Sequence, residues 1–234
     1  MAHNRLKILL WQLAILAVTL GVWEWGFDLR KLASLKAFVP SILDPYFISK
    51  PSAIWTSFLK LGCFKDTAGF GACIDKNANN LWYATVVTLK NTWWGFLGGS
   101  GSGVVMGLLL GRSDYLAKIC EPYIVAANSV PRIALVPLII LMFGLGDMSK
   151  IVTAWIVVFF VVFFNTFEGT RSVDRDQIAA ARLLGASELV VLRTVVIPSA
   201  LAWVFASLTP AVSFALIGVI VGEFIGAERG LGKL

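Results

Sequence analysis

The stretch EGTRSVDRDQIAAARLLGASELVVLRTVVIP, residues 168–198, is polar, lies between two long apolar segments and decides how the chain is organised. Asp174 is a good N-cap, and the Ala-rich run 178–184 after it predicts a short helix. Gly185 stands where a left-handed C-cap would end that helix. The sequence therefore predicts a compact helix–turn–helix in the middle of an apolar chain.

The second helix of this hairpin is expected to begin after Ser187 and to run to Pro198, where the next apolar segment starts. The hairpin carries four arginines, namely Arg171, Arg175, Arg182 and Arg193. By the positive-inside rule these arginines place residues 168–198 in the cytoplasm. A structured polar hairpin between two spans suggests a docking surface for a partner, and the alternative is a plain basic loop.

The composition requires a membrane. Of 234 residues, 58% are hydrophobic and 15% are charged, and the mean hydropathy is +0.80. A soluble domain of this composition would have too little polar surface. The net charge of +6 is scattered along the chain rather than arranged in a stripe, so it suits cytoplasmic loops and anionic lipid headgroups rather than nucleic acid.

The chain is expected to be an all-α, polytopic helical bundle with a cytoplasmic N-terminus. Arg5 and Lys7 precede the first apolar run, and no small-residue cleavage site follows it, so this run is interpreted as an uncleaved span. The expected spans are 8–25, 92–111, 121–146, 151–167 and 197–221. Residues 27–92 form an extracytoplasmic segment with an amphipathic interfacial helix over 51–61, and residues 147–150 form a short outer turn.

Glycines recur every four residues in the second expected span, at Gly95, Gly99, Gly103, Gly107 and Gly111. This spacing puts them near one face of a helix, where small residues let another helix approach closely in lipid. A nucleotide-binding glycine loop is disfavoured because the run lies inside a span. We interpret the stripe as a helix-packing face.

Two cysteines, Cys63 and Cys73, lie in the expected extracytoplasmic segment with nine residues between them. A disulfide between them is physically sensible on the oxidising side of a bacterial membrane, and the alternative is two unrelated thiols. Metal binding is not expected, because the single histidine, His3, lies on the other side of the membrane.

Polar residues inside the apolar segments are the candidates for a solute pathway. Arg132 follows Pro131 and is the only charge of the third expected span after its first residue. An arginine in lipid costs about 2.5–3.5 kcal/mol on insertion scales, so Arg132 should face protein or water. It is either a pathway residue near a broken helix or an arginine paired for structure alone. The candidate set is Asn128, Pro131, Arg132, Ser213 and Glu223.

The chain offers no constellation for catalysis. The tail GAERGLGKL has Ala227 and Leu234 where a P-loop needs Gly and Ser or Thr, so it is not a Walker A motif. One histidine excludes histidine-based clusters. We therefore expect a protein that is not an enzyme and binds neither a metal nor a cofactor of its own.

The hairpin resembles the signature loop of permease subunits of bacterial ATP-binding-cassette importers, whose pattern is Glu-Ala-Ala-x3-Gly-x9-Ile-x-Leu-Pro. The residues that match it are Ala180, Ala181, Gly185, Val195, Ile197 and Pro198. Ala179 departs from the pattern, because the family usually has Glu there, and Asp176 and Glu188 are the alternative sources of the missing carboxylate. The stretch 81–232 is similar to the nitrate, sulfonate, taurine and bicarbonate branch, through SVPRIALVPLIILMFGLG at 129–146 and VGEFIGAERGLG at 221–232.

This resemblance implies a multi-pass subunit of the bacterial inner membrane that forms the pathway for a small, anionic solute. Two copies would pair as a homodimer, a cytoplasmic ATPase dimer would bind the coupling helices and hold ATP and Mg, and an extracytoplasmic protein would deliver the substrate. ATPase docking would use Asp176, Ala179, Ala180, Ala181, Gly185 and Pro198. The family generally has a sixth span after the fifth, so truncation is expected.

Two other functions are considered. An ion-coupled secondary transporter would show internal repeats and more intramembrane acids, whereas Glu24, Glu121 and Glu223 lie near span ends. A non-transporting membrane scaffold would use the hairpin only as an assembly contact. Co-purification with an ATPase whose activity responds to substrate would distinguish these functions.

Overall fold

A computed structural model describes residues 2–30, 49–64, 80–226 and 229–234. These residues are mostly helical and, within these ranges, include no strand, which confirms the all-α class. The helices are α1 Ala2–Arg30, α2 Pro51–Leu61, α4 Leu81–Gly111, α5 Asp114–Ser129, α6 Val136–Phe143, α7 Asp147–Arg171, α8 Arg175–Leu183, α9 Glu188–Val191 and α10 Ile197–Gly226. Shorter turns are η2 Arg132–Leu135, the π-helical η3 Leu192–Val196 and η4 Leu231–Lys233. The chain divides into two compact units, residues 1–80 and 81–234.

In the first unit, α1 is an apolar helix whose segment Lys7–Gly26 is long enough to cross a membrane. The helix expected over 51–61 is α2, which begins with Pro51 in its first turn, where the missing N–H costs nothing. Ser52 joins the two helices, because its backbone N–H and its hydroxyl both donate to the Glu24 carboxylate, at 3.0 and 2.6 Å. Cys73 lies outside the described residues, so its predicted bridge to Cys63 stays a prediction.

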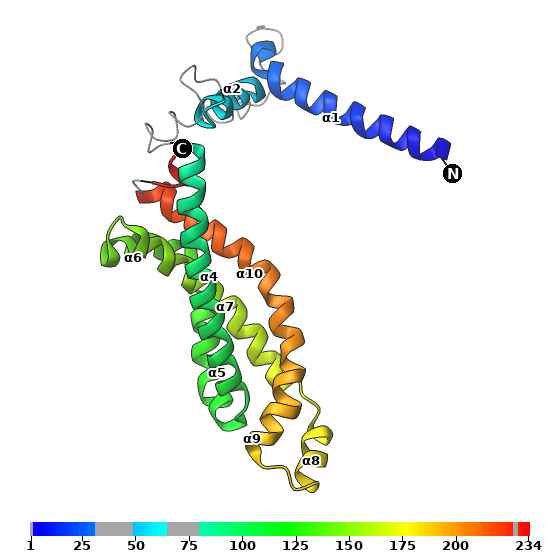
Figure 1. The fold of residues 1–234 in the computed structure, drawn as a ribbon, viewed down its shortest axis with the longest axis vertical. Coiled ribbons are helices and arrows are strands. Elements are labelled where there is room, and N and C mark those ends of the chain that lie inside the picture. Colours follow the sequence, from blue (N-terminus) through cyan, green and yellow to red (C-terminus); the bar gives the residue numbers. More distant parts are fainter. Residues whose placement is uncertain (1, 31–48, 65–79, 227–228) are drawn as a thin grey trace. The chain divides into compact units, whose positions relative to one another are not determined.

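In the second unit, α4 and α7 lie side by side and run in the same direction (Figure 1). All five glycines of the expected packing face are buried along this contact. A Cβ at Gly95 would lie 2.5 Å from Ala154 Cβ, and one at Gly111 would lie 2.8 Å from Thr170 Cβ. The two backbones therefore approach too closely for any residue larger than glycine along this face.

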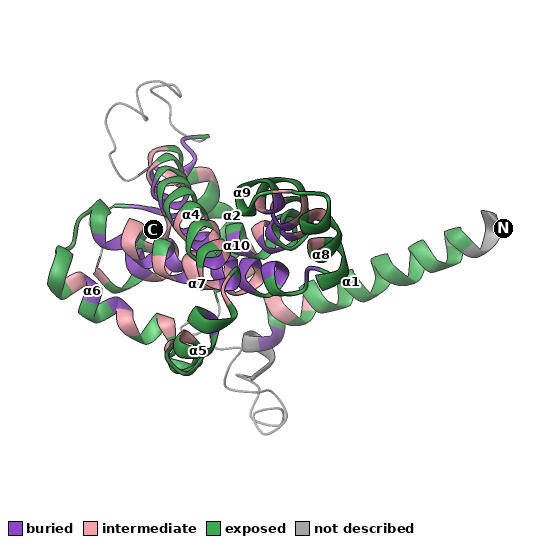
Figure 2. Cartoon of the chain, turned by 90° about the horizontal axis from the view of Figure 1, so that it is seen from below, coloured by how far each residue is buried: buried purple, intermediate pink, exposed green. Residues whose placement is uncertain are grey.

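Helix α10 packs against α7 in the opposite direction, with Gly218 near Ala154 and Gly222 near Lys150. The core between α7 and α10 is made of small side chains, namely Ala154, Val158, Val162, Ala211, Ala215 and Val219. Figure 2 shows this buried material in α4, α7 and α10, whereas α1 is largely exposed. The apolar outer surfaces of the long helices are free to contact lipid.

Four described helical segments are long and apolar enough to cross a membrane, namely Lys7–Gly26, Leu81–Gly111, Asp147–Arg171 and Glu188–Gly226. The third expected span is instead a broken pair. Helix α5 ends at Ser129, and the chain turns by 79° before η2 and α6. If this pair counts as one span, the total is the expected five.

Three expected boundaries differ from the structure. The second span was expected to begin at residue 92, but α4 begins at Leu81, so the end of the segment 27–92 is helical. Residues 147–150 are the first turn of α7 rather than a loop. The helix after Ser187 does not end at Pro198 but continues into α10. The π-helical η3 directly before this proline accommodates its ring and its missing N–H.

Candidate functional site

The hairpin of residues 168–198 lies at one end of the second unit, where Figure 1 shows α8 and α9 beyond the ends of α7 and α10. The N-cap Asp174 accepts a hydrogen bond from the Asp176 backbone N–H at 2.9 Å. At the other end of α8, Gly185 has φ +83°, and its N–H donates to Arg182 O at 2.9 Å. The Ala186 N–H donates to Ala181 O at 3.1 Å, which completes a Schellman motif.

The two faces of α8 have different surroundings. On the inner face, Ile178 and Ala181 pack on the buried side chains Val173, Val191 and Val196. Ala179 and Ala180 are exposed, and Leu183 and Leu184 are each 89% exposed at the C-terminal tip. Exposed leucines at the polar end of a membrane protein are unfavourable unless something covers them. The tip of α8 is therefore the strongest candidate in this unit for a protein contact.

Ion pairs attach both ends of α8 to the rest of the unit. Arg182 donates to both oxygens of Glu188, at 2.9 and 3.2 Å, and Glu188 is also 3.5 Å from Arg112 at the end of α4. At the start of α8, Arg175 lies 3.7 Å from Asp114, the first residue of α5. Each such exposed pair is weak, at about 0–1 kcal/mol, but together they fix where α8 sits on the α4–α5 turn.

These contacts also show which of the carboxylates near Ala179 is already engaged in ion pairs. The sequence offered Asp176 or Glu188 as substitutes for the missing glutamate at this position. Glu188 already binds two guanidinium groups, whereas Asp176 has no ion pair among the described residues. Sequence reasoning missed Arg112 and Asp114 as partners of the hairpin, because nothing in the local pattern reports a contact between residues more than sixty positions apart.

The structure brings three of the pathway candidates together at the break between α5 and η2. Arg132 donates a hydrogen bond to the Asn128 side chain, and its guanidinium lies 5.1 Å from the centre of the Phe160 ring on α7. Pro131 directly precedes it at the N-cap of η2. The buried Arg132 Nε has no hydrogen-bond partner. Ser213 is exposed on α10 and has no described contact with this group.

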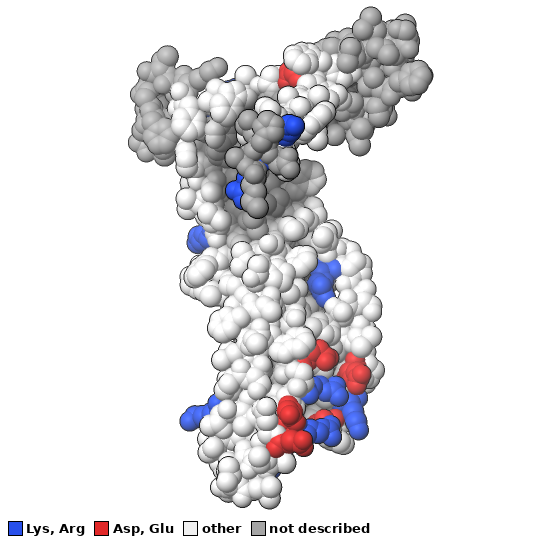
Figure 3. Space-filling model, turned by 90° about the vertical axis from the view of Figure 1, so that its right-hand side faces the viewer, with Lys and Arg blue, Asp and Glu red and all other residues white. Residues whose placement is uncertain are grey.

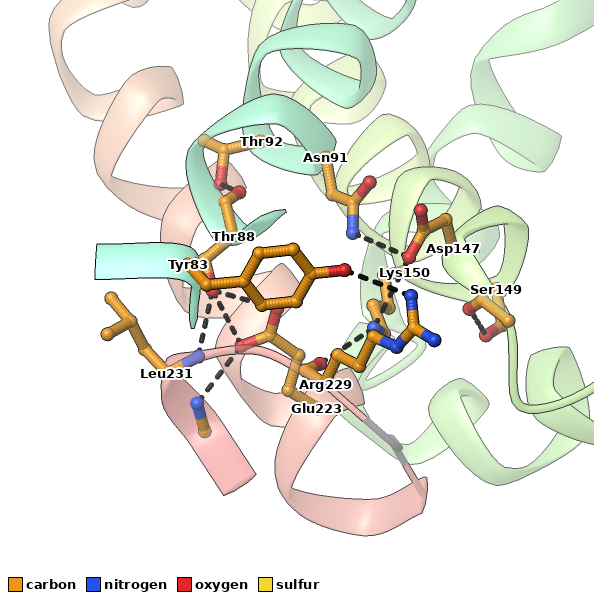
Figure 4. A network of polar contacts seen from close by, with 12 residues as sticks. Tyr83, Thr88, Asn91, Thr92, Asp147, Ser149, Lys150, Glu223, Arg229 and Leu231 are labelled. Carbon is orange, nitrogen blue, oxygen red and sulfur yellow. Dashed lines mark hydrogen bonds and ion pairs between the residues drawn. The ribbon is translucent and has the colours of Figure 1, made fainter. Parts of the chain in front are cut away.

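Glu223 belongs instead to a different polar cluster, shown in Figure 4. Its side chain is only 1% exposed, and it accepts hydrogen bonds from the Thr88 hydroxyl at 2.9 Å and from the Gly232 N–H at 3.0 Å. Thr88 in turn accepts from the Leu231 N–H at 2.9 Å. The sequence suggested that Glu223 emerges at the outer end of its span, but the structure buries it as an anchor for residues 229–234.

Lys150 completes this cluster, although the sequence predicts a short outer turn over residues 147–150. It is 3% exposed, and its Nζ donates to Arg229 O at 2.9 Å and to Asp147 Oδ1 at 3.5 Å. Arg229 also donates to the Tyr83 hydroxyl at 2.9 Å. The cluster thus connects the ends of α4, α7 and α10. Among the described residues, no group of three or more His, Cys, Asp or Glu side chains could hold a metal ion.

The comparison with known families agrees with this architecture. Residues 103–234 match the family described as binding-protein-dependent transport system inner membrane component, and the chain belongs to this family. The match includes α8, the ion-paired residues around it and the buried Glu223. The resemblance found in the hairpin is therefore confirmed over more than half of the chain.

Individual relatives agree as well. A probable ABC transporter permease protein of Haemophilus influenzae is 35% identical over 68% of this chain and 64% of its own length. The putative aliphatic sulfonates transport permease protein SsuC of Bacillus subtilis is 34% identical over 60% of this chain and 51% of its own. The taurine transport system permease protein TauC of Escherichia coli is 29% identical over 93% and 72%. The chain thus spans between half and two thirds of the length of the first two relatives.

A solved structure shares the fold. It is the crystal structure of an amino acid ABC transporter with histidines, with a TM-score of 0.51 and 23% sequence identity. The match covers 64% of this chain and 73% of that one. This comparison supports the arrangement of the helices.

Proposed function

We propose that this chain is the membrane subunit of an ATP-driven importer and carries a small anionic solute across the bacterial inner membrane. Two copies would enclose the pathway, with the N-termini in the cytoplasm. A separate ATPase dimer would bind ATP and Mg, and an extracytoplasmic binding protein would deliver the solute. The family membership and the named permease functions of the relatives support this proposal.

The observation that carries the proposal is the construction of α8. The helix is capped at both ends, is joined by ion pairs to the α4–α5 turn, and exposes two adjacent leucines at its tip. A partner that covered Leu183 and Leu184 would remove about 1.5–3 kcal/mol of unfavourable exposure per leucine. Movement of that partner would displace α8 as a rigid element and pull on the ends of α4, α7 and α10 together.

The substrate class follows from the sulfonate and taurine relatives and from Arg132. Its guanidinium stands at the break of the α5–α6 pair, where the 79° turn leaves backbone groups without helical partners. Backbone groups and one positive charge at such a break are suited to a sulfonate or a similar oxyanion. We place Asn128, Pro131 and Arg132 along the pathway, and Ser213 on its α10 side.

Reconstitution with the cognate ATPase and binding protein tests the proposal. Leu184→Ser should lower ATP-dependent uptake of labelled taurine or alkanesulfonate into proteoliposomes at least tenfold, and should release the ATPase subunit during purification. Leu141→Ser is the matched control, because Leu141 is 83% exposed on α6, away from α8. Full uptake by the Leu184 variant would contradict the role of α8.

Two alternatives predict different outcomes in the same vesicles. An ion-coupled secondary transporter would take up solute without ATP when a proton or sodium gradient is imposed. A scaffold subunit would retain the ATPase but show no uptake under either condition. We expect uptake that stops when ATP is removed and continues when the ion gradient is dissipated.

A further inference from the structure

A cavity of about 340 Å³ lies between α8 and the ends of α4 and α7. Its charged lining consists of Arg112, Asp114, Arg171, Arg175, Arg182 and Glu188. Figure 3 shows that charged side chains of both signs gather at this end of the second unit, below a surface that is mostly uncharged and carries only scattered Lys or Arg. The tip leucines of α8 do not line the cavity, so it is a different feature from the exposed tip.

The cavity has an excess of positive charge that its own carboxylates do not neutralise. Glu188 is shared between Arg112 and Arg182, and Asp114 is paired with Arg175. Arg171 has no carboxylate partner among the described residues, and its guanidinium lies 5.4 Å from the centre of the Phe167 ring. A guanidinium held over an aromatic ring keeps its N–H donors available for an acceptor.

The helix dipoles around the cavity do not change the positive sign of its electrostatic potential. The C-terminal ends of α4 and α7 border the cavity, and so do the N-terminal ends of α5, of α8 and of the continuous helix that begins with α9. Two negative and three positive helix ends leave the potential positive, with the same sign as the side chains. Ala179 also lines the cavity and leaves open the space that a longer side chain would fill.

The position of the cavity indicates which anion it can meet. The apolar segments of α4 and α7 end at Gly111 and Arg171, and both residues line the cavity. Lipid headgroups begin where apolar spans end. On the inside, the cavity is closed by the apolar side chains Val173, Val191 and Val196, so its arginines are the donors that an anion would meet.

We propose that this cavity binds a phosphate group, supplied by an acidic phospholipid headgroup or by free phosphate, with Arg171 as the principal donor. Arginine suits this role because its planar guanidinium can donate two parallel hydrogen bonds to one phosphate. Bound phosphate would add a bridge between α7 and α8 beside the Arg112–Glu188–Arg182 contacts, which join the end of α4, α9 and α8. The site is independent of the transported solute and of ATP.

The full chain, purified in a mild detergent, allows a direct test. Retention of phosphatidylglycerol relative to phosphatidylcholine is measured by native mass spectrometry, and binding of inorganic phosphate by thermal shift at constant ionic strength. Arg171→Gln should lower the affinity about tenfold, as expected for the loss of a charge-assisted hydrogen bond. Arg193→Gln is the control, since Arg193 is exposed on η3 and does not line the cavity.

Ala179→Glu is a second variant, which adds a carboxylate to the cavity without removing an arginine and should lower phosphate binding by a similar factor. Preferential retention of phosphatidylglycerol identifies a headgroup site, and a thermal shift with phosphate in delipidated protein identifies a free-phosphate site. Equal effects of Arg171→Gln and Arg193→Gln, or binding of neither ligand, would overturn the proposal. If Ala179→Glu leaves phosphate binding unchanged and only weakens ATPase co-purification, the occupant is an acidic side chain of that partner, and the proposal is also overturned.

Discussion

Substitution of Gly99 by alanine tests the contact on which the second unit is built. A Cβ at Gly99 would lie 2.7 Å from Trp155 O and 2.7 Å from Val158 Cβ, both on α7. Ordinary carbon contacts are about 3.5–4.0 Å, so α4 and α7 must separate by several tenths of an ångström or more. Overpacking of this kind costs about 1–3 kcal/mol, and the separation also weakens the contacts of the neighbouring glycines.

Gly101→Ala is the matched control, because Gly101 lies on the same helix and a Cβ there would meet no atom within 4 Å. Alanine favours a helix over glycine by about 1 kcal/mol at both positions, so this gain cancels in the comparison. We expect the Gly99 variant to be less stable than the Gly101 variant by about 1–3 kcal/mol. Unfolding of the full chain by a denaturing detergent, followed by circular dichroism, measures this difference. Equal free energies of unfolding for the two variants would refute the close packing of α4 on α7.

Other predictions concern the two ends of the unit. Glu223→Gln should destabilise the fold by about 1–3 kcal/mol, because it replaces one of the two carboxylate oxygens that face the Thr88 hydroxyl with an NH2 donor. Glu168→Gln at an exposed site should change stability little. Detergent unfolding of both variants checks this. Gly185→Ala should lower the free energy of unfolding by about 1–2 kcal/mol, because φ is +83° there and alanine disfavours a left-handed backbone. The variant should also slow ATP-dependent uptake in proteoliposomes. Uptake equal to that of the unmodified chain would count against a fixed turn. Glu188→Gln should loosen α8, which is measured as faster proteolysis near residue 185; an unchanged cleavage rate would mean that the two arginine pairs contribute nothing.

Rules that depend only on neighbouring residues, such as helix capping and glycine spacing, were sufficient to predict the hairpin of residues 168–198 and the packing face of α4. Asp174 and Gly185 mark the two ends of α8 because capping depends on residues a few positions apart. The glycine period of four predicted a close approach, since every side chain that could prevent the contact is absent from one face of α4. The composition indicated a membrane protein, and the apolar segments along the sequence predicted the number of spans.

Contacts between distant segments were beyond these rules. Lys150 was assigned to a turn because a charge between two apolar runs usually marks a loop, yet its ammonium is held by the Arg229 carbonyl seventy-nine positions away. Glu223 was grouped with the pathway candidates as a polar residue of an apolar segment, whereas the structure surrounds it with Thr88 and the backbone of residues 231–232. The hydrophobic periodicity of a helix indicates on which face a residue lies, but it contains no information on which other segment packs against that face.

The packing of the second unit also constrains how α8 could transmit movement. Between Gly95 and Gly111, α4 contacts the α7 backbone at every turn, so a slide of one helix along the other would drive side chains into carbonyl groups. The Glu223 cluster fixes the far ends of the same helices. Helices α4 and α7 should therefore move as one body, and bending is left to the two places where the helical ladder is already interrupted, the 79° break before η2 and the π-helical η3. Because η3 joins α9 to α10, a force on α8 would reach α10 along the chain, whereas only the weak, exposed Arg112–Glu188 pair links α9 to the end of α4. The covalent route is the stronger one, so a push at the hairpin would rotate α10 against the α4–α7 pair.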